Sequence, residues 1–116
     1  MSYIAVFITA SSLEESERIA NGLIDSKLAA CVNIIPKIRS IYTWKGKKET
    51  SDEFLLIAKT KADIFDALKS KVIELHSYTT PEVVSILISA GNKDYLSWID
   101  ENLRPHCGEN SEASLE

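Results

Sequence analysis

One segment of the chain alternates between apolar and polar residues over a length that a small domain cannot hold. In residues 29–44 most even positions are apolar, and polar side chains such as Asn33 and Arg39 stand between them. This period of two is typical of a strand with one buried face. About 16 residues at ~3.3 Å each extend roughly 50 Å, whereas a compact domain of this size has a radius of gyration of ~13 Å. The strand must therefore bend sharply or project beyond its own core.

A polar turn and a returning strand follow. Residues 45–48 are polar and contain a glycine, and residues 49–60 are apolar at their centre, so the two strands are expected to form a hairpin. Its far end carries large apolar side chains: Ile41, Tyr42 and Trp44. A projecting apolar ribbon is an aggregation hazard unless a partner covers it, which predicts an obligate homo-oligomer held by strand pairing between subunits. The alternative is a hairpin that bends at Pro36, a residue that marks a bulge, a bend or an edge strand, and folds back on its own core.

The segments around the hairpin predict two helices and two more strands. Residues 3–10 are almost continuously apolar, which indicates a strand buried on both faces. Ser12 and Glu15 have the spacing of a capping box, and the helix that they begin ends near Lys27. Its predicted buried face consists of Leu13, Ile19, Ala20, Leu23 and Ile24.

A second helix, a strand and a last helix complete the pattern. Thr60 and Asp63 resemble another capping box, before a helix with inward residues Ile64, Phe65, Leu68, Val72 and Leu75. Residues 76–81 break that helix, and residues 82–90 read as a strand. After Gly91-Asn92 comes a short helix that Pro105 stops, with apolar residues Tyr95, Leu96, Trp98, Ile99 and Leu103.

The order β-α-β-β-α-β plus a terminal helix predicts an α+β fold of the ferredoxin-like type. In that arrangement a four-stranded antiparallel sheet carries its helices on one face. The 116 residues leave no room for a second domain, so one domain is expected over residues 1–105. Residues 106–116 are polar and lack apolar periodicity, which predicts a flexible tail.

Composition argues against several classes of protein. The net charge of −4 does not fit a basic nucleic-acid binder, and no apolar run reaches the roughly 20 residues that cross a bilayer. No Lys or Arg precedes the first apolar run, which disfavours a secretory signal. Cys31 and Cys107 stand far apart and form no CxxC motif, so free thiols in a reducing cytoplasm are expected.

Three side chains are candidate metal ligands, and each has a simpler interpretation. His76, at a helix end, could bind Cu(II) or Zn(II), although a single histidine there more often caps the helix. Cys31 could be a soft metal ligand or a small buried hydrophobe. Glu82 could bind a metal or act as a base; more simply, it could face solvent or pair with Lys59. Lys59 itself could bind an anion or be a surface cation.

No catalytic motif is present. The chain has no Gly-rich phosphate loop, no nucleophile elbow and no metalloprotease signature, so neither enzymatic activity nor an organic cofactor is expected. Trp44 and Trp98 are most simply packing residues in the core or at an interface.

Five blocks in order resemble the CutA family of divalent-cation tolerance proteins. They are KLAACVNIIP at 27–36, SIYTWKGK at 40–47, LLIAKT at 55–60, HSYTTPE at 76–82 and DYLSW at 94–98. The resemblance runs from Tyr3 to Leu103. It implies a ferredoxin-like protomer in a very stable homotrimer whose long hairpins interlock, and a role in tolerance of copper and other divalent cations, with copper binding in some members.

The resemblance also implies a cleft between subunits. Cys31, Tyr78 and Glu82 match family positions that line it, and His76 matches one of two histidines of copper-binding bacterial members. Ile8 and Leu75 stand where those members have a cysteine and the other histidine. The expected cleft residues are Trp44, Lys59, Tyr78 and Trp98.

The function expected from sequence is that of a cytoplasmic homotrimer that binds copper or other divalent cations without catalysis. Two alternatives stay open. One is a signalling module like the PII trimers, with a small anionic ligand held by Trp44, Lys59 and Glu82. The other is a stable scaffold that anchors other proteins.

Overall fold

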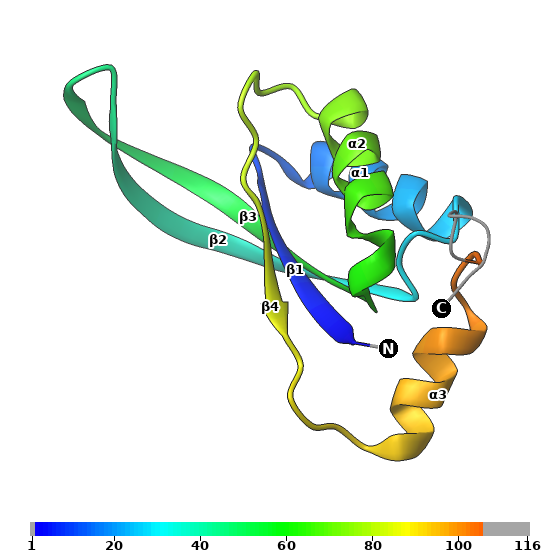
Figure 1. Ribbon diagram of the computed structural model, residues 1–116. Coiled ribbons are helices and arrows are strands. Elements are labelled where there is room, and N and C mark those ends of the chain that lie inside the picture. Colours follow the sequence, from blue (N-terminus) through cyan, green and yellow to red (C-terminus); the bar gives the residue numbers. More distant parts are fainter. Residues whose placement is uncertain (1, 106–116) are drawn as a thin grey trace.

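The computed structural model describes residues 2–105 and confirms the predicted α+β, ferredoxin-like fold (Figure 1). Its elements are β1 (Tyr3–Ala10), α1 (Leu13–Asp25), β2 (Cys31–Trp44), β3 (Lys47–Lys61), a 3-10 turn η1 (Ala62–Ile64), α2 (Phe65–Leu75), β4 (Val83–Leu87) and α3 (Lys93–Glu101). The sheet order is β2-β3-β1-β4, with every neighbouring pair antiparallel. The predicted tail 106–116, with Cys107, lies outside the described residues. None of the helices in residues 2–105 is long and apolar enough to span a membrane.

Burial in β1 alternates, so the prediction of a strand buried on both faces is wrong for the single chain. Ile4, Val6 and Ile8 are at most 4% exposed, whereas Ala5 and Phe7 are only half-buried. The physical reason is that α1 and α2 cover one face of the sheet (Figure 1). The opposite face keeps accessible apolar side chains on several strands: Phe7, Ile35, Leu55, Ile57, Val84 and Ile86.

The first helix begins as predicted, with one difference at its cap. The Ser12 hydroxyl accepts a hydrogen bond from the backbone N–H of Glu15 at 3.1 Å. The Glu15 carboxylate does not return to Ser12 but accepts from the backbone and hydroxyl of Ser11. Leu13 and Ile24 are 49% and 39% exposed, so the buried face is narrower than predicted.

The second predicted capping box is wrong. Thr60 belongs to β3, and the 3-10 turn before α2 has Lys61 as its N-cap, which makes no side-chain capping bond. The inward face is confirmed, because Ile64, Leu68 and Val72 are all buried. The last helix follows Gly91-Asn92 as predicted, and Asn92 caps it, since its side chain accepts from the N–H of Asp94 at 3.0 Å.

The β2–β3 hairpin projects from the body as an arm (Figure 1). The molecule measures 46 × 27 × 25 Å, and its radius of gyration of 15.1 Å exceeds the ~13 Å of a compact domain. The alternative in which the hairpin folds back is therefore wrong. At the tip, Lys45 and Gly46 have φ angles of 51° and 80°, as in a two-residue type I′ turn whose twist matches the strands.

A bulge at Pro36 and Lys37 changes which side chains share a face. Ile35 pairs with Leu55 and Ile38 with Glu53, so the two residues between them on β2 stand opposite one of β3. One extra residue reverses the alternation beyond it. The expectation that even positions of the whole strand share an interior face is therefore wrong after Pro36. Of the three features that Pro36 could mark, the structure has the bulge, on an edge strand.

Candidate functional site

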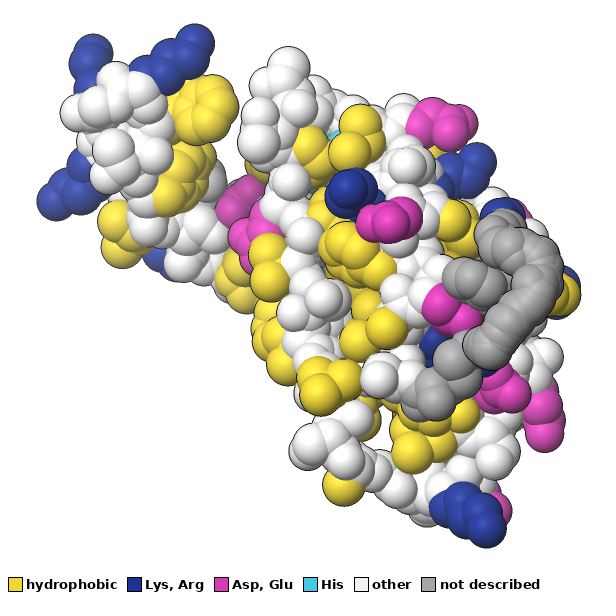
Figure 2. Space-filling model, viewed as in Figure 1, with side chains coloured by type: hydrophobic (Ala, Val, Ile, Leu, Met, Phe, Trp, Pro, Cys, Tyr) yellow, Lys and Arg dark blue, Asp and Glu magenta, His cyan; other side chains and the backbone are white. Residues whose placement is uncertain are grey.

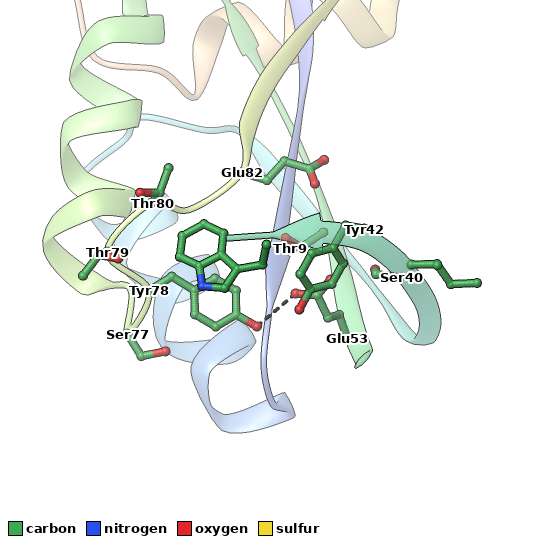
Figure 3. A pocket seen from close by; sticks show the side chains of 11 residues that line it. Thr9, Ser40, Tyr42, Glu53, Ser77, Tyr78, Thr79, Thr80 and Glu82 are labelled. Atoms are coloured by element: carbon green, nitrogen blue, oxygen red, sulfur yellow. Dashed lines mark hydrogen bonds between the residues drawn. The ribbon is translucent and has the colours of Figure 1, made fainter. Parts of the chain in front are cut away.

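A cleft of about 700 Å³ lies where the arm leaves the body. Figure 2 shows the arm's apolar side chains turned toward the body across this hollow, and Figure 3 shows the lining residues. The arm contributes Ser40, Ile41, Tyr42, Trp44 and Glu53, and the body contributes Thr9, Ser77, Tyr78, Thr79, Thr80 and Glu82. The cleft therefore lies between the projecting arm and the body.

Two carboxylates and a phenol set the electrostatics of the cleft. Glu53 is 8% exposed, and its Oε2 accepts a hydrogen bond from the Tyr78 hydroxyl at 2.9 Å. Burial, together with this bond and the charge of Glu53, raises the pKa of Tyr78 to about 12, so the phenol stays a donor at neutral pH. Burial, and then the charge of Glu53, also raises the pKa of Glu82. The lining contains no Lys, Arg or His, and the cleft is acidic.

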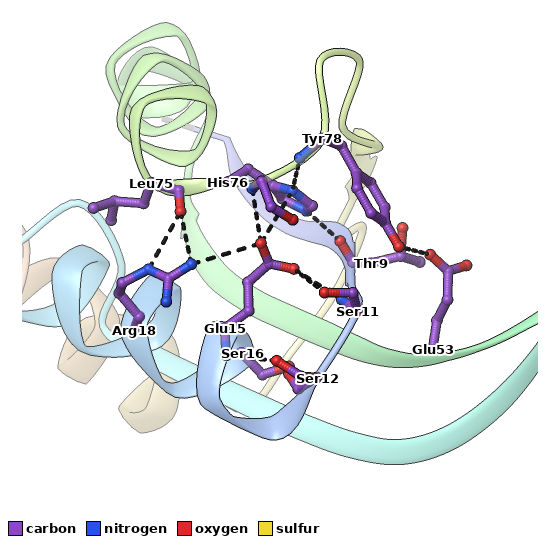
Figure 4. A network of polar contacts seen from close by, with 11 residues as sticks. Thr9, Ser11, Ser12, Glu15, Ser16, Arg18, Glu53, Leu75, His76 and Tyr78 are labelled. Atoms are coloured by element: carbon purple, nitrogen blue, oxygen red, sulfur yellow. Dashed lines mark hydrogen bonds and ion pairs between the residues drawn. The ribbon is translucent and has the colours of Figure 1, made fainter.

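The loop at the edge of the cleft is held by a carboxylate that sequence reasoning treated only as part of a cap (Figure 4). Glu15 is 3% exposed. Its Oε1 accepts from the N–H of Ser11 at 2.8 Å, and its Oε2 accepts from the N–H of Ser77 at 2.8 Å. Burial alone would raise the pKa of Glu15, but hydrogen bonds from Ser11 and Ser77 outweigh it and lower the pKa to about 2. The ionised group ties the start of α1 to the cleft loop.

His76 lies behind the cleft with its side chain fully buried. Its Nε2 is 2.6 Å from the carbonyl oxygen of Thr9, which can only accept, so we assign the proton to Nε2. Its Nδ1 accepts from the N–H of Tyr78 at 3.1 Å. Both ring nitrogens of a neutral imidazole are therefore engaged, and a metal could bind only after one bond is released. The backbone N–H of His76 also caps α2 by donating to Val72.

The other two predicted metal ligands lie far from each other. Cys31 stands opposite Lys59, which stands opposite Ala5, whereas Glu82 precedes Val83 at the other edge of the sheet. Within residues 2–105 no group of three or more His, Cys, Asp or Glu side chains is arranged to hold a metal ion. One protomer therefore does not bring His76, Cys31 and Glu82 into one site.

Of the four predicted cleft residues, only Trp44 and Tyr78 line this cleft. The ammonium of Lys59 donates to the side chain of Asn33 and does not pair with Glu82. Trp98 is in α3, at the end of the molecule away from the arm (Figure 1), and stacks on Tyr95 with ring centroids 5.7 Å apart. The anion site of Trp44, Lys59 and Glu82 is thus not assembled within a protomer.

Sequence reasoning missed Glu53, which lines the cleft. The signal was available in β3, since Glu53 has the same parity as Leu55 and Ile57 and thus interrupts an apolar face. Its pairing with Ile38, however, follows from the bulge, which alternation alone does not place.

The chain matches known proteins over most of its length. Residues 4–102 match the family model of the CutA1 divalent ion tolerance protein. The divalent-cation tolerance protein CutA of Archaeoglobus fulgidus is 50% identical over 98 residues, 84% of this chain and 95% of the relative.

Solved structures of proteins named CutA1 have the same fold as this chain. CutA1 of Oryza sativa has a TM-score of 0.88 at 43% identity and covers 90% of this chain and 96% of that one. The divalent cation tolerance protein Cut A1 of Thermus thermophilus has a TM-score of 0.86 at 44% identity, over 88% and 99% of the two chains. By sequence and by fold, the chain belongs to the CutA1 divalent ion tolerance family.

Proposed function

We propose that the protein is a homotrimeric divalent-cation tolerance protein of the cytoplasm that binds copper or other divalent cations without catalysis. The observation that carries the proposal is the 50% identity, over 84% of the chain, to a relative named for divalent-cation tolerance. Within residues 2–105 Cys31 has a free thiol, which favours a reducing compartment. In the cleft, no Ser or Thr hydroxyl donates to a basic side chain of the described residues, which gives no support to a nucleophilic step.

The assembly is supported by apolar surface that one chain leaves open. On the arm, Ile41 is 67% exposed and Trp44 is 49% exposed; on the uncovered sheet face, Val84 is 51% and Ile86 is 49% exposed. Large apolar side chains exposed in this number are typical of protein interfaces. The edges of β2 and β4 are also open to pairing, since these are the outer strands. Sister copies would cover both surfaces.

Cation binding is proposed to need more than one protomer. Copper(II) takes several N, O or S donors, and the described part of one chain does not gather three of them. Cys31 and Glu82 lie on opposite edges of the sheet, so copies of the chain can bring them together where a single chain does not. His76 could join only by releasing Thr9 or Tyr78.

The test is a calorimetric titration of the full chain with Cu(II), Zn(II) and Mn(II), preceded by light scattering. The expected mass is about three times the 12.9 kDa of one chain. The expected affinity is at least tenfold weaker in Cys31→Ser and in Glu82→Gln, and unchanged in Glu49→Gln, an exposed carboxylate outside the cleft. A mass near that of one chain at micromolar concentration would overturn the trimer, and an absence of binding by all three ions would overturn direct cation binding. Unchanged affinity in His76→Ala would remove His76 from the site.

A further inference from the structure

The last helix presents two aromatic rings that the described protomer leaves half-exposed. Tyr95 and Trp98 of α3 are 41% and 42% exposed. Their rings stack on each other, with centroids 5.7 Å apart and an angle of 24° between the planes. The helix packs on the body through another residue, Ile99, which is fully buried. Exposed aromatic rings that lie together mark a contact surface, because aromatic residues concentrate in protein interfaces.

Negative charge flanks these two rings. Asp94 lies four residues before Trp98 and Glu101 lies three residues after it, and these spacings place side chains on one face of a helix. Both carboxylates are exposed, and neither belongs to an ion pair within residues 2–105. The α3 face, which consists of Asp94, Tyr95, Trp98 and Glu101, is therefore both aromatic and acidic.

The tip of the arm has the complementary chemistry, and Figure 2 shows basic side chains gathered at this end of the molecule. Trp44 is 49% exposed, and the Lys45 ammonium lies 5.8 Å from the centroid of its ring. Lys47 is the cross-strand partner of Trp44, so the two side chains leave the same face of the hairpin. Neither lysine forms an ion pair within the described part of the chain. The arm tip (Trp44, Lys45 and Lys47) is therefore an aromatic ring beside two positive charges.

The two surfaces keep opposite charge when their neighbours are counted. Residues 44–49 hold three lysines against one glutamate, whereas α3 holds three acidic residues against one lysine. The acidic base of the arm is too distant to oppose the contact. Glu53 pairs with Ile38, six residue pairs from Trp44, which at ~3.3 Å each is about 20 Å along the arm. Salt screens exposed charges at that separation, because it exceeds the Debye length of about 8 Å.

One chain cannot join its own two surfaces. The arm tip and α3 lie at opposite ends of a molecule that is 46 Å long (Figure 1). A contact between them therefore joins two copies. It pairs two different surfaces, so each copy gives its arm tip to the next one, and such a contact closes a ring when the rotation between copies allows it.

We propose that the arm tip of one copy docks on the α3 face of a sister copy, with the ring of Trp44 against Tyr95 and Trp98 and the lysines beside Asp94 and Glu101. This inference rests on the proposed homotrimer and names the surface of the neighbour that receives the arm. The aromatic contact removes exposed apolar surface on both copies, and the opposite charges around it select this pairing over others.

The test is charge reversal on both surfaces, measured by sedimentation of the full chain over a dilution series. The arm-tip variant Lys45→Glu with Lys47→Glu, and the α3 variant Asp94→Lys with Glu101→Lys, should each raise the concentration at which the trimer dissociates at least tenfold. The four changes together should restore it to within about threefold, because the exchanged charges attract again. Unchanged dissociation in the two variants, or no recovery in the combined one, would overturn the proposal.

Matched controls carry the same charge changes elsewhere. Lys69→Glu on α2 and Glu17→Lys on α1 alter exposed residues outside both surfaces and should leave dissociation unchanged. A tenfold effect in these controls as well would show that net charge, and not docking of the arm tip, governs assembly, and would overturn the proposal.

A second measurement reports on α3 directly. In a Trp44→Phe background Trp98 is the only tryptophan of the chain, and phenylalanine keeps an aromatic ring at the arm tip. The emission of Trp98 should shift to longer wavelength as the trimer dissociates on dilution, because the ring becomes exposed to water. Constant emission through dissociation would overturn the proposal. A shift without any effect of the charge variants would mean that another part of a sister copy covers α3, and would overturn it too.

Light scattering separates this inference from the assembly on which it rests. A mass of about three chains, together with charge variants that dissociate as the unaltered chain does, contradicts the docking alone. A mass near one chain contradicts the trimer and the docking with it.

Discussion

The strands β2 and β3 run through both the body and the arm of this molecule, but the two regions are stabilised in different ways. In the body, Leu56 and Ala58 of β3 are fully buried beneath α1 and α2. Toward the tip of the same hairpin, Ile41 and Trp44 of β2 are 67% and 49% exposed. Strand pairing continues unbroken from Ile38 to the turn. The difference lies in the missing second layer, so the arm has a hydrogen-bond ladder but almost no buried surface of its own.

That difference assigns a source of stability to each region. A two-stranded ribbon is at best marginally stable in water, and burial against a further layer is what stabilises it. The body obtains that layer from its own helices, whereas the arm must obtain it from other copies. Substitutions in the two regions should therefore change different measured quantities.

The largest effect on unfolding is expected in the body. Leu56→Ala removes a fully buried side chain and should lower the free energy of unfolding by about 3 kcal/mol, because a cavity remains under the helices. Chemical denaturation followed by circular dichroism measures the change. Leu13→Ala, at a 49% exposed position on α1, is the control and should change it by less than about 0.5 kcal/mol. Equal losses would show that the helix-covered face is not the main source of stability.

The next effect concerns the link between the body and the cleft loop. Glu15→Gln replaces a carboxylate that accepts bonds on both oxygens with an amide that has one acceptor, so it should cost about 2 kcal/mol. The pKa of Glu15 is lowered from 4.5 to about 2 in the folded chain. Its contribution is therefore complete above about pH 4.5 and is lost as the pH falls toward 2.

A pH series of denaturation curves measures this contribution. The unaltered chain should lose more stability between about pH 5 and about pH 2 than Glu15→Gln does, and Glu14→Gln, an exposed neighbour, should behave as the unaltered chain. Parallel pH profiles for Glu15→Gln and the unaltered chain would mean that the carboxylate does not hold the loop.

How much of the structure could be predicted from the sequence depends on whether a feature is local or long-range. The order of elements and the projecting hairpin follow from periodicity and chain length, which are local properties. The pairing of Glu53 with Ile38 does not follow from periodicity, because the bulge at Pro36 and Lys37 depends on the register between two strands. Likewise His76 could be placed at a helix end, but its bond to Thr9 joins residues 67 positions apart in the chain.

In the arm, truncation of a large apolar side chain should weaken assembly of the oligomer and leave the fold of the body unchanged. Trp44→Ala removes a large, half-exposed ring near the tip and should raise the concentration at which the oligomer dissociates about tenfold, since aromatic anchors dominate interfaces. Sedimentation over a dilution series measures this shift. Circular dichroism of the body should be unchanged. Dissociation at the original concentration would show that the tip of the arm lies outside the interface.

The smallest effect is expected at the turn, and it asks whether body and arm unfold together. Gly46 has a φ of 80° and open space where a Cβ would stand, so Gly46→Ala should cost about 1 kcal/mol through backbone strain alone. Gly46→Asn should cost less, because asparagine tolerates this region. Hydrogen exchange shows where the cost falls. We expect faster exchange at the arm amides and unchanged exchange at the β1 amides. The reason is that α1 and α2 cover β1, whereas no layer of the same chain covers the arm. Equal acceleration in both would mean that assembly has joined arm and body into one cooperative unit.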